Sequence, residues 1–324
     1  MQLNPKTAHF IGTGLSRPEC VLAERDGTLW ASDNRATACR ISPDGRQQLF
    51  GTAGGTPNGL ALCPDGTLYA ADIENGLVLA VDRDGTEHVV LDDIDGHPLG
   101  AVNFPYIDDS GNLWVTVSTR TQPRSAAKET PVADGYILRL DQNGPVIIAD
   151  GLFFTNEIRI DPSGRYLYIA ETTAGQISRQ PIHSDGTLGN RETFGKTPLF
   201  TGAAVDGIAF DSDGNLWVTE LTRNAIFVLD PLGREHLAFE DPTGEILKEP
   251  SSLAFGGHDL RTLYVGTLSM NHVVSFQAPV AGHPMSHWNS SALAPNARLS
   301  AGSRHKRFAR SGDTEFVGTT GLHR

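Results

Sequence analysis

The chain has little of what marks several common protein classes. Only three of its 324 residues are cysteine, and their spacing fits neither a disulfide framework nor a zinc site. No stretch approaches the roughly 20 apolar residues of a membrane span. The first residues also lack the apolar run of a secretory signal. These absences predict a cytoplasmic protein that contacts no membrane.

Basic residues are also scarce relative to acidic ones. The chain has 26 lysines and arginines against 38 aspartates and glutamates, a formal net charge of −12. Because nucleic-acid affinity rests on clustered Lys and Arg, this balance argues against a nucleic-acid partner and leaves a small molecule as the expected one. The acidic excess is compatible with cation binding, but an acidic surface that only aids solubility explains it equally well.

Several catalytic motifs are missing as well. There is no Gly-x-Gly-x-x-Gly or Walker motif for nucleotides, no His-Glu-x-x-His for zinc, and no Gly-x-Ser-x-Gly nucleophile elbow. No helical periodicity is long enough to predict a bundle. The function must therefore come from another pattern.

That pattern is an internal repeat. Six times, a polar residue opens a short apolar stretch, a tight turn follows, and a second stretch opens on an aromatic residue. These polar lead residues are Glu19, Asn58, Asn103, Asn156, Asp206 and Ser251. In four repeats the aromatic follows eleven positions later: Glu19/Trp30, Asn58/Tyr69, Asn103/Trp114 and Asp206/Trp217.

The period of the repeat predicts the fold. Steps of 39 to 53 residues between lead residues, with several short strands in each, are typical of propeller blades. We therefore predict an all-β, six-bladed β-propeller forming one domain over residues 1–288, followed by a disordered basic tail over 289–324. The strand-like segment His9–Gly12 should complete the last blade. The six repeat aromatics should form inter-blade core: Trp30, Tyr69, Trp114, Tyr168, Trp217 and Tyr264.

In a propeller the lead residues would form a ring at one mouth of the central channel. That ring offers two carboxylates, three carboxamides and a hydroxyl, a set of oxygen ligands that suits a hard divalent cation. Ca²⁺ is favoured, with Mg²⁺, Mn²⁺ and Zn²⁺ as alternatives. Asn and Asp also serve as ordinary turn residues at strand starts, so for Asn58 alone the structural reading is the simpler one.

At these lead residues the sequence resembles the regucalcin/gluconolactonase family of six-bladed propellers. Three segments match the family's metal-binding segments in order: Pro18-Glu19-Cys20, Thr155-Asn156-Glu157 and Val205-Asp206-Gly207. The resemblance implies that Glu19, Asn156 and Asp206 are metal ligands. It also implies that Asn103 contacts the substrate.

The sequence departs from that family next to Asn103. An arginine that holds substrate hydroxyls in family gluconolactonases is missing from the segment Ala101-Val102-Asn103-Phe104, which weakens the case for an aldonolactone. An insertion over residues 117–134 brings Arg120, Arg124 and Lys128 to the same mouth. Since loops on a rigid scaffold commonly carry specificity, Arg120 or Arg124 could bind substrate, or both could be solvated loop charges.

The resulting expectation is a metal-dependent hydrolase that opens a lactone or similar small ester at the mouth of the channel. A bound cation would polarise the carbonyl, and Asp206 would act as general base. Three alternatives stay open: a non-catalytic ligand- or metal-binding propeller, a phosphotriesterase, and a strictosidine-synthase-like enzyme. The oligomeric state is not predicted.

Overall fold

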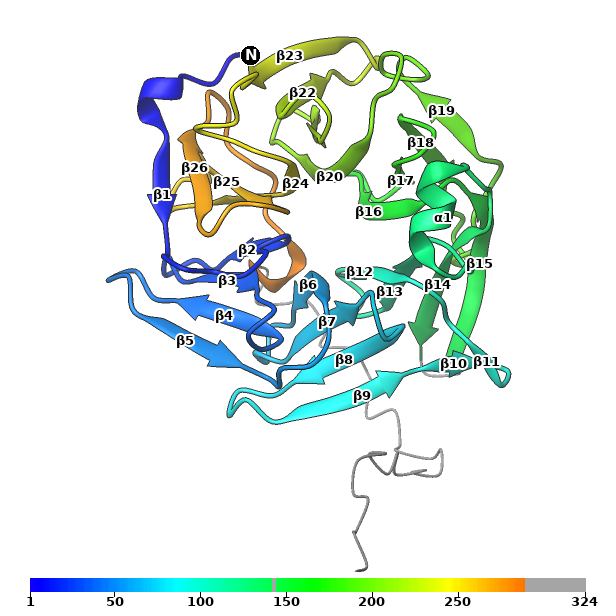
Figure 1. Cartoon of the computed structure of the whole chain (residues 1–324). Helices are drawn as coiled ribbons and strands as arrows, with labels where there is room; N and C mark the ends of the chain where they lie inside the picture. The colour runs from blue at the N-terminus through cyan, green and yellow to red at the C-terminus, as the bar shows by residue number, and fades with distance from the viewer. Residues whose placement is uncertain (142–143, 289–324) are drawn as a thin grey trace, which may run out of the picture.

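The computed structural model describes residues 1–141 and 144–288, which form a ring of six four-stranded antiparallel sheets (Figure 1). The ring is the predicted six-bladed β-propeller. In five sheets the first strand along the chain lies nearest the centre and the last lies at the rim, and in the sixth sheet the rim strand comes from residues 9–11. The predicted tail, 289–324, lies outside the described residues.

The strands follow the sequence repeat closely. The first three sheets are built from β2 (Val21–Ala23), β3 (Leu29–Ser32), β4 (Ala38–Ile41) and β5 (Gln47–Phe50); β6 (Pro57–Leu62), β7 (Leu68–Asp72), β8 (Leu77–Val81) and β9 (Glu87–Leu91); and β12 (Val102–Ile107), β13 (Leu113–Val117), β14 (Gly135–Asp141) and β15 (Gly144–Leu152). The other three are built from β16 (Thr155–Ile160), β17 (Tyr166–Glu171), β18 (Gln176–Pro181) and β19 (Glu192–Phe194); β20 (Val205–Phe210), β21 (Leu216–Glu220), β22 (Ala225–Leu229) and β23 (Glu235–Glu240); and β24 (Pro250–Gly256), β25 (Thr262–Thr267), β26 (Val273–Gln277) and β1 (His9–Ile11).

A few short elements lie outside the six sheets. They are the hairpin β10 (Asp93–Ile94) with β11 (His97–Pro98), the helix α1 (Arg124–Glu129), and the 3₁₀ turns η1 (Pro5–Thr7) and η2 (Ser286–Trp288). None of the helices among the described residues is both long and apolar enough to cross a membrane.

The turn aspartates explain why the repeat couples an Asp to a later aromatic. In the third blade Asp108 accepts hydrogen bonds from the backbone N–H groups of Ser110 and Asn112 and from the indole Nε1 of Trp114, at 2.8–3.0 Å. Asp211 and Trp217 make the same pairing in the fifth blade at 2.9 Å. One carboxylate thus closes the turn and satisfies the buried indole of the next strand.

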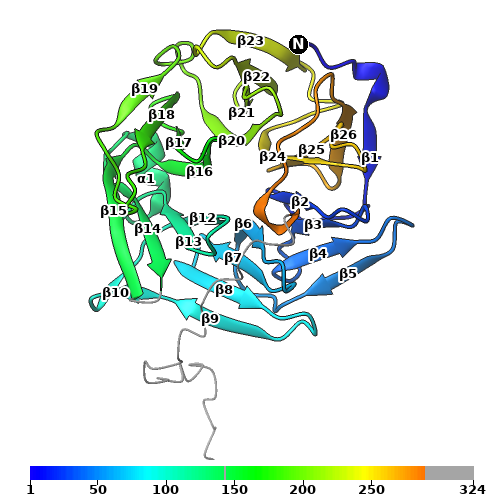
Figure 2. The same ribbon diagram turned by 180° about the vertical axis from the view of Figure 1, so that it is seen from behind.

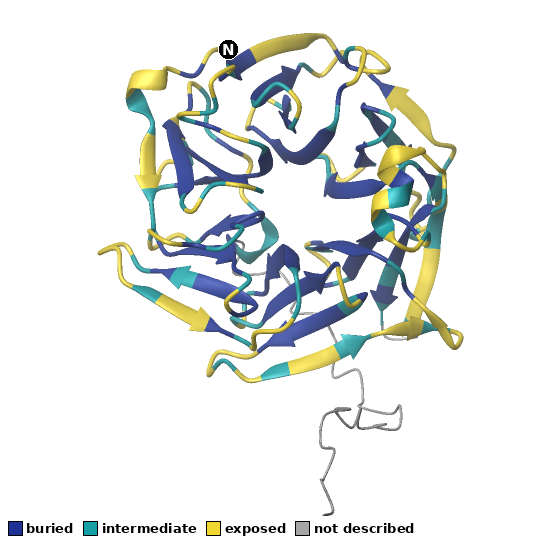
Figure 3. Cartoon of the chain, in the orientation of Figure 1, coloured by how far each residue is buried: buried dark blue, intermediate teal, exposed yellow. Residues whose placement is uncertain are grey.

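The core lies within and between the blades. All six repeat aromatics are buried, as predicted. Edge-to-face pairs join neighbouring blades, with ring centroids 5.1 Å apart for Tyr168 and Phe210 and 5.7 Å apart for Trp217 and Phe255. Figure 3 shows the result: innermost strands are buried and rim strands carry the exposed surface.

The ring is closed by the first strand, which confirms the prediction for His9–Gly12. β1 pairs antiparallel with β26, placing His9 opposite Ser275 and Ile11 opposite Val273. The sixth sheet therefore takes its outer strand from the start of the chain, and its β26 edge is paired rather than exposed.

The two ends of the ring differ. The helix α1 lies at one end, here called the α1 face, which faces the viewer in Figure 1. The lead residues Glu19 and Asp206 belong to the same end, because Lys128 of α1 acts electrostatically on both carboxylates. The other end, the turn face, faces the viewer in Figure 2 and carries hairpin turns such as 108–112, which line one cavity together with residues 283–286. Residues 281–288, the strap, cross the turn face.

The strap is bonded to several blades. The Gly282 backbone bridges to Asp211, the Ser286 hydroxyl donates to the Ile107 carbonyl at 2.7 Å, and the Trp288 indole donates to the Ala23 carbonyl at 2.6 Å. The strap is therefore packed against the propeller.

Candidate active site

The lead residues sit at irregularities in the innermost strands. In five blades the ladder between the first and second strand shifts register next to the lead residue: Asn58 in β6, Asn103 in β12, Asn156 in β16, Asp206 in β20 and Ser251 in β24. Glu19 stands two residues before β2. A bulge turns a side chain out of the regular alternation, and bulges are common beside active sites.

Four of the six lead residues hold a buried oxygen that lacks a hydrogen-bond partner among the described residues. The atoms are Glu19 Oε2, Asn103 Oδ1, Asn156 Oδ1 and Asp206 Oδ1. Their residues are only 2 to 4% exposed. Because a buried polar atom without a partner costs roughly 1–3 kcal/mol, four at equivalent repeat positions point to a ligand that satisfies them.

The two amides among them are held at their nitrogen ends. Asn103 Nδ2 donates to the Ser118 hydroxyl at 2.8 Å, and Asn156 Nδ2 donates to the Thr172 hydroxyl at 3.2 Å. Each amide is thereby fixed with its carbonyl oxygen left over. The fixed orientation suits an oxygen that coordinates a cation.

The other two lead residues, Asn58 and Ser251, make hydrogen bonds to other residues of the protein. Asn58 accepts a hydrogen bond at 2.7 Å from Arg17 Nη2, and its Nδ2 donates to the main-chain carbonyl of Asn103 at 3.2 Å. The Ser251 hydroxyl donates to the Glu19 main-chain carbonyl at 2.7 Å. Both residues brace the neighbouring blade rather than face an open position, and Asn58 does so through Arg17 and Asn103 instead of through the turn backbone.

Burial disfavours ionisation of the two lead carboxylates, Glu19 and Asp206. It raises the pKa of Glu19 to about 8, with Arg17 and Lys128 opposing the rise and Glu157 adding to it. Burial also raises the pKa of Asp206 well above its usual range, and repulsion from Glu19 and Glu157 contributes further. Two such carboxylates stay ionised together only when positive charge lies between them.

The donor set fits a hard divalent cation. It comprises two carboxylates and two carboxamide oxygens with no nitrogen or sulfur ligand, which suits Ca²⁺ better than a transition metal. No group of three or more His, Cys, Asp or Glu side chains with metal-holding geometry occurs within residues 1–141 and 144–288. Amide oxygens are therefore necessary members of any such site.

Sequence reasoning missed one buried carboxylate beside this set. Glu157 is 2% exposed and forms an ion pair with Arg159, whose Nη2 lies 2.8 Å from Glu157 Oε2. The same oxygen accepts the backbone N–H of Ile208 at 3.3 Å. The available signal was a glutamate directly after Asn156, where the second and fifth repeats have Gly59 and Gly207.

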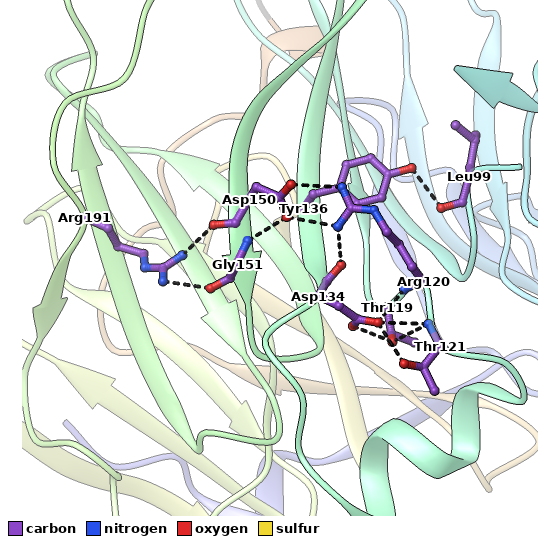
Figure 4. Close-up of polar contacts among 9 residues, drawn as sticks. All are labelled: Leu99, Thr119, Arg120, Thr121, Asp134, Tyr136, Asp150, Gly151 and Arg191. Atoms are coloured by element: carbon purple, nitrogen blue, oxygen red, sulfur yellow. Dashed lines mark hydrogen bonds and ion pairs between the residues drawn. The ribbon is translucent and has the colours of Figure 1, made fainter. Parts of the chain in front are cut away.

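The insertion over residues 117–134 folds back on the α1 face. Arg120 is fully engaged: its guanidinium makes two bonds of 2.9 and 3.0 Å to Asp150, donates to the Asp134 carbonyl and stacks 4.0 Å from the Tyr136 ring centroid (Figure 4). Arg124 pairs with Glu74 of the second blade. Both predicted substrate-binding arginines therefore have carboxylate partners, and their role toward substrate stays a prediction.

Lys128, on α1, behaves differently. The residue as a whole is exposed, but its ammonium turns inward over the Phe154 ring, 4.8 Å from the centroid. Burial lowers the pKa of Lys128, and attraction to Asp206 and Glu19 opposes that effect. The lysine thus lies within electrostatic reach of both lead carboxylates.

A cavity of about 670 Å³ lies at the turn face, under the strap. Its lining includes Arg139, Asp161 and His283. Asp161 accepts the backbone N–H groups of Arg165 and Tyr166 at 2.8 and 2.7 Å, so it serves the turn. The unpartnered lead oxygens belong to the opposite end of the ring.

Comparisons with known proteins agree with this architecture. A family model described as "SMP-30/Gluconolactonase/LRE-like region" matches residues 17–269. The solved structure of a calcium-binding protein, regucalcin, from Agrobacterium tumefaciens superposes with a TM-score of 0.67 at 19% identity, covering 85% of this chain and 97% of that one. At this identity the superposition shows the shared fold.

Two curated relatives are enzymes by name. A 6-deoxy-6-sulfogluconolactonase from Pseudomonas putida is 29% identical over 174 residues, 52% of this chain and 56% of that protein. A diisopropyl-fluorophosphatase from Loligo vulgaris is 29% identical over 215 residues, 62% of this chain and 68% of that protein. The chain thus matches little more than half the length of the first relative.

Proposed function

Because the chain belongs to the SMP-30/gluconolactonase/LRE-like family, we propose that it is a divalent-cation-dependent hydrolase that opens a lactone or similar small ester at the α1 face. One observation carries this proposal: four lead residues at one end of the ring each hold a buried oxygen without a partner. The lactonase relative supports the substrate class.

Three residues would hold the cation: Glu19, Asn156 and Asp206. Their unpartnered oxygens offer two negative charges and one amide dipole, and Ca²⁺ is the best match to such a set. When bound, the cation would supply Lewis-acid polarisation of the scissile carbonyl and charge neutralisation in the transition state.

The remaining steps fall to the chain's own side chains. Asp206 would accept the proton of the attacking water, since its Oδ1 has no hydrogen-bond donor among the described residues. Asn103, fixed through Ser118, would orient the substrate or that water. Arg120 and Arg124 would reach substrate only by exchanging Asp150 and Glu74 for it.

The test is a pH-indicator assay for acid release over sugar, aliphatic and aromatic lactones. It is run with Ca²⁺, Mg²⁺, Mn²⁺ and Zn²⁺ and with excess chelator. We expect chelation to abolish hydrolysis and added Ca²⁺ to restore it. The Asp206→Asn variant should lose hydrolysis, whereas a matched control, Asp213→Asn, should retain it. Asp213 is an exposed carboxylate of the same blade at the turn face.

A result of calcium binding with no hydrolysis of any lactone would overturn the lactonase proposal and leave a binding propeller. Phosphotriesters belong in the panel too, because the Loligo vulgaris relative is named for a fluorophosphate substrate. The same arrangement could polarise a P=O bond as well as a C=O bond. Turnover of phosphotriesters alone would make that second candidate the function.

A further inference from the structure

The three basic side chains of the 117–134 insertion differ in whether they have an ion-pair partner. Arg120 is held by Asp150 at 2.9 Å, and Arg124 pairs with Glu74. Lys128 has no acidic group within 4.0 Å among the described residues, and its ammonium lies over the Phe154 ring. It is therefore the insertion's one basic side chain without an ion-pair partner in the part of the chain that the structure describes.

The position of Lys128 is set by its surroundings rather than by an ion pair. Ala127 beside it is buried and anchors α1, while the ion pair of Arg124 with Glu74 ties the helix to the second blade. The face of the Phe154 ring attracts the ammonium, and Phe154 precedes Asn156 by two residues. The ammonium is thus held at the edge of the proposed cation site.

The charge balance of this site leaves Lys128 uncompensated. A divalent cation would offset the two charges of Glu19 and Asp206. Arg17, the other basic residue acting on both carboxylates, bonds to neutral atoms, the Pro57 carbonyl at 3.0 Å and Asn58 Oδ1 at 2.7 Å. With the cation in place, two positive charges at this mouth lack a protein counter-charge.

Resting on the proposed function, we propose that the substrate carries an anionic substituent, a carboxylate, sulfonate or phosphate, and that Lys128 binds it. An ammonium at a partly desolvated mouth attracts such a group more strongly than one in bulk water. Lys128 would then determine specificity: it contacts the substituent and leaves the bond-breaking step to the cation and Asp206.

The test uses two lactones that share a ring. D-glucono-1,4-lactone ends in a hydroxymethyl group, and D-glucaro-1,4-lactone ends in a carboxylate. We expect the wild-type chain to prefer the anionic lactone in kcat/KM. Lys128→Met should lower the anionic-to-neutral ratio by roughly 10- to 100-fold, mainly through KM, as expected for loss of a charge-assisted contact.

Two further variants sharpen the result. Lys128→Arg should restore much of the preference, because it keeps the charge, and the exposed Lys196→Met should keep the wild-type ratio. The preference should also weaken as salt rises from about 50 to 500 mM in the wild type and not in Lys128→Met. Circular dichroism establishes that each variant is folded.

A binding experiment separates this inference from the proposed function. Tetrahydrofuran-2-carboxylate and tetrahydrofuran-2-methanol are matched ring ethers with no bond to hydrolyse, and NMR titration of the Ca²⁺-loaded protein measures their affinities. Stronger binding of the carboxylate that Lys128→Met removes supports the inference even when no lactone is hydrolysed. Equal affinities, absence of binding, or a preference that survives Lys128→Met would overturn it, whatever the hydrolysis assay shows.

Discussion

Two aspartates stand at opposite ends of the innermost strand of the fifth blade, and the protein treats them in opposite ways. Asp206, at the α1 face, is 3% exposed and leaves Oδ1 without a partner. Asp211, just past the other end of β20, is equally buried but saturated: Asp213, Asn215 and Trp217 donate to it at 2.8–3.0 Å. An aspartate thus stabilises the turn at one end of the strand, whereas at the other end an aspartate keeps an oxygen free to bind a ligand.

The difference extends around the ring. Turn aspartates such as Asp108 receive backbone N–H groups and an indole, so they are complete without a ligand. The lead residues that matter for the proposed chemistry lack such donors. Unpartnered buried oxygens, rather than acidic residues as such, distinguish the functional end from the structural end. Four experiments test this contrast.

The largest effect should come from Asp206→Asn. We expect kcat/KM for the best lactone to fall by roughly 10³-fold or more, because both a cation ligand and the general base are changed. The metal-free variant should be at least as stable as the metal-free wild type, since a buried carboxylate without donors is removed. Steady-state kinetics and urea unfolding check both parts; a clear loss of stability would contradict the contrast.

Asp211→Ala should behave in the reverse way. It leaves the Trp217 indole and the turn N–H groups without their acceptor, so we expect a loss of about 2–4 kcal/mol in the free energy of unfolding. The lactone KM should change little in whatever fraction is folded. Urea midpoints of the metal-free proteins measure the cost. A stability equal to that of wild type would show that the turn aspartates are not structural.

Calcium should stabilise the wild type through the α1 face alone. A ligand at about one hundred times its Kd adds roughly 2–3 kcal/mol to the free energy of unfolding. We expect a rise in the urea midpoint of that size on adding Ca²⁺, absent in Asp206→Asn and Glu19→Gln but present in Asp213→Asn. An undiminished rise in Asp206→Asn would place the cation elsewhere.

The smallest expected effect is on stability at acidic pH and involves Asp241. Burial disfavours ionisation of Asp241, but hydrogen bonds from Leu247, Thr243 and Ile246 outweigh it and lower the pKa to about 2. A lowered pKa stabilises the fold above the unfolded value of 3.8 and loses that contribution as pH falls toward 2. Wild type should thus exceed Asp241→Asn by about 1 kcal/mol more at pH 5 than at pH 2.5, as measured by urea midpoints.

Much of the fold could be predicted because the residues that define each repeat lie close together in the sequence. The turn aspartates, the strand alternation and the spacing to the aromatics each act within about a dozen residues. The count of six repeats predicted six sheets, and the extra strand-like segment His9–Gly12 predicted how the ring closes; the structure confirms both.

The site was predictable only in outline. The repeat identifies six lead residues, but whether each is free depends on partners far along the chain: Arg17 lies 41 residues from Asn58, and Glu19 lies 232 residues from Ser251. The inward position of Lys128 depends on a helix too short to leave a periodic signal. The ligand roles of Glu19, Asn156 and Asp206 came from family resemblance and stay predictions, supported by their unpartnered oxygens.

The closure of the ring by β1 also affects how the protein is made. Residues 9–11 are synthesised roughly 260 residues before their partners in β26. At about 5–20 residues per second, the first strand waits roughly 15 to 50 seconds before it can pair. During that interval the other five sheets can assemble in order, while the β1 segment stays unpaired. Until β26 is made, the β1 segment is an unpaired strand with which non-native partners can pair.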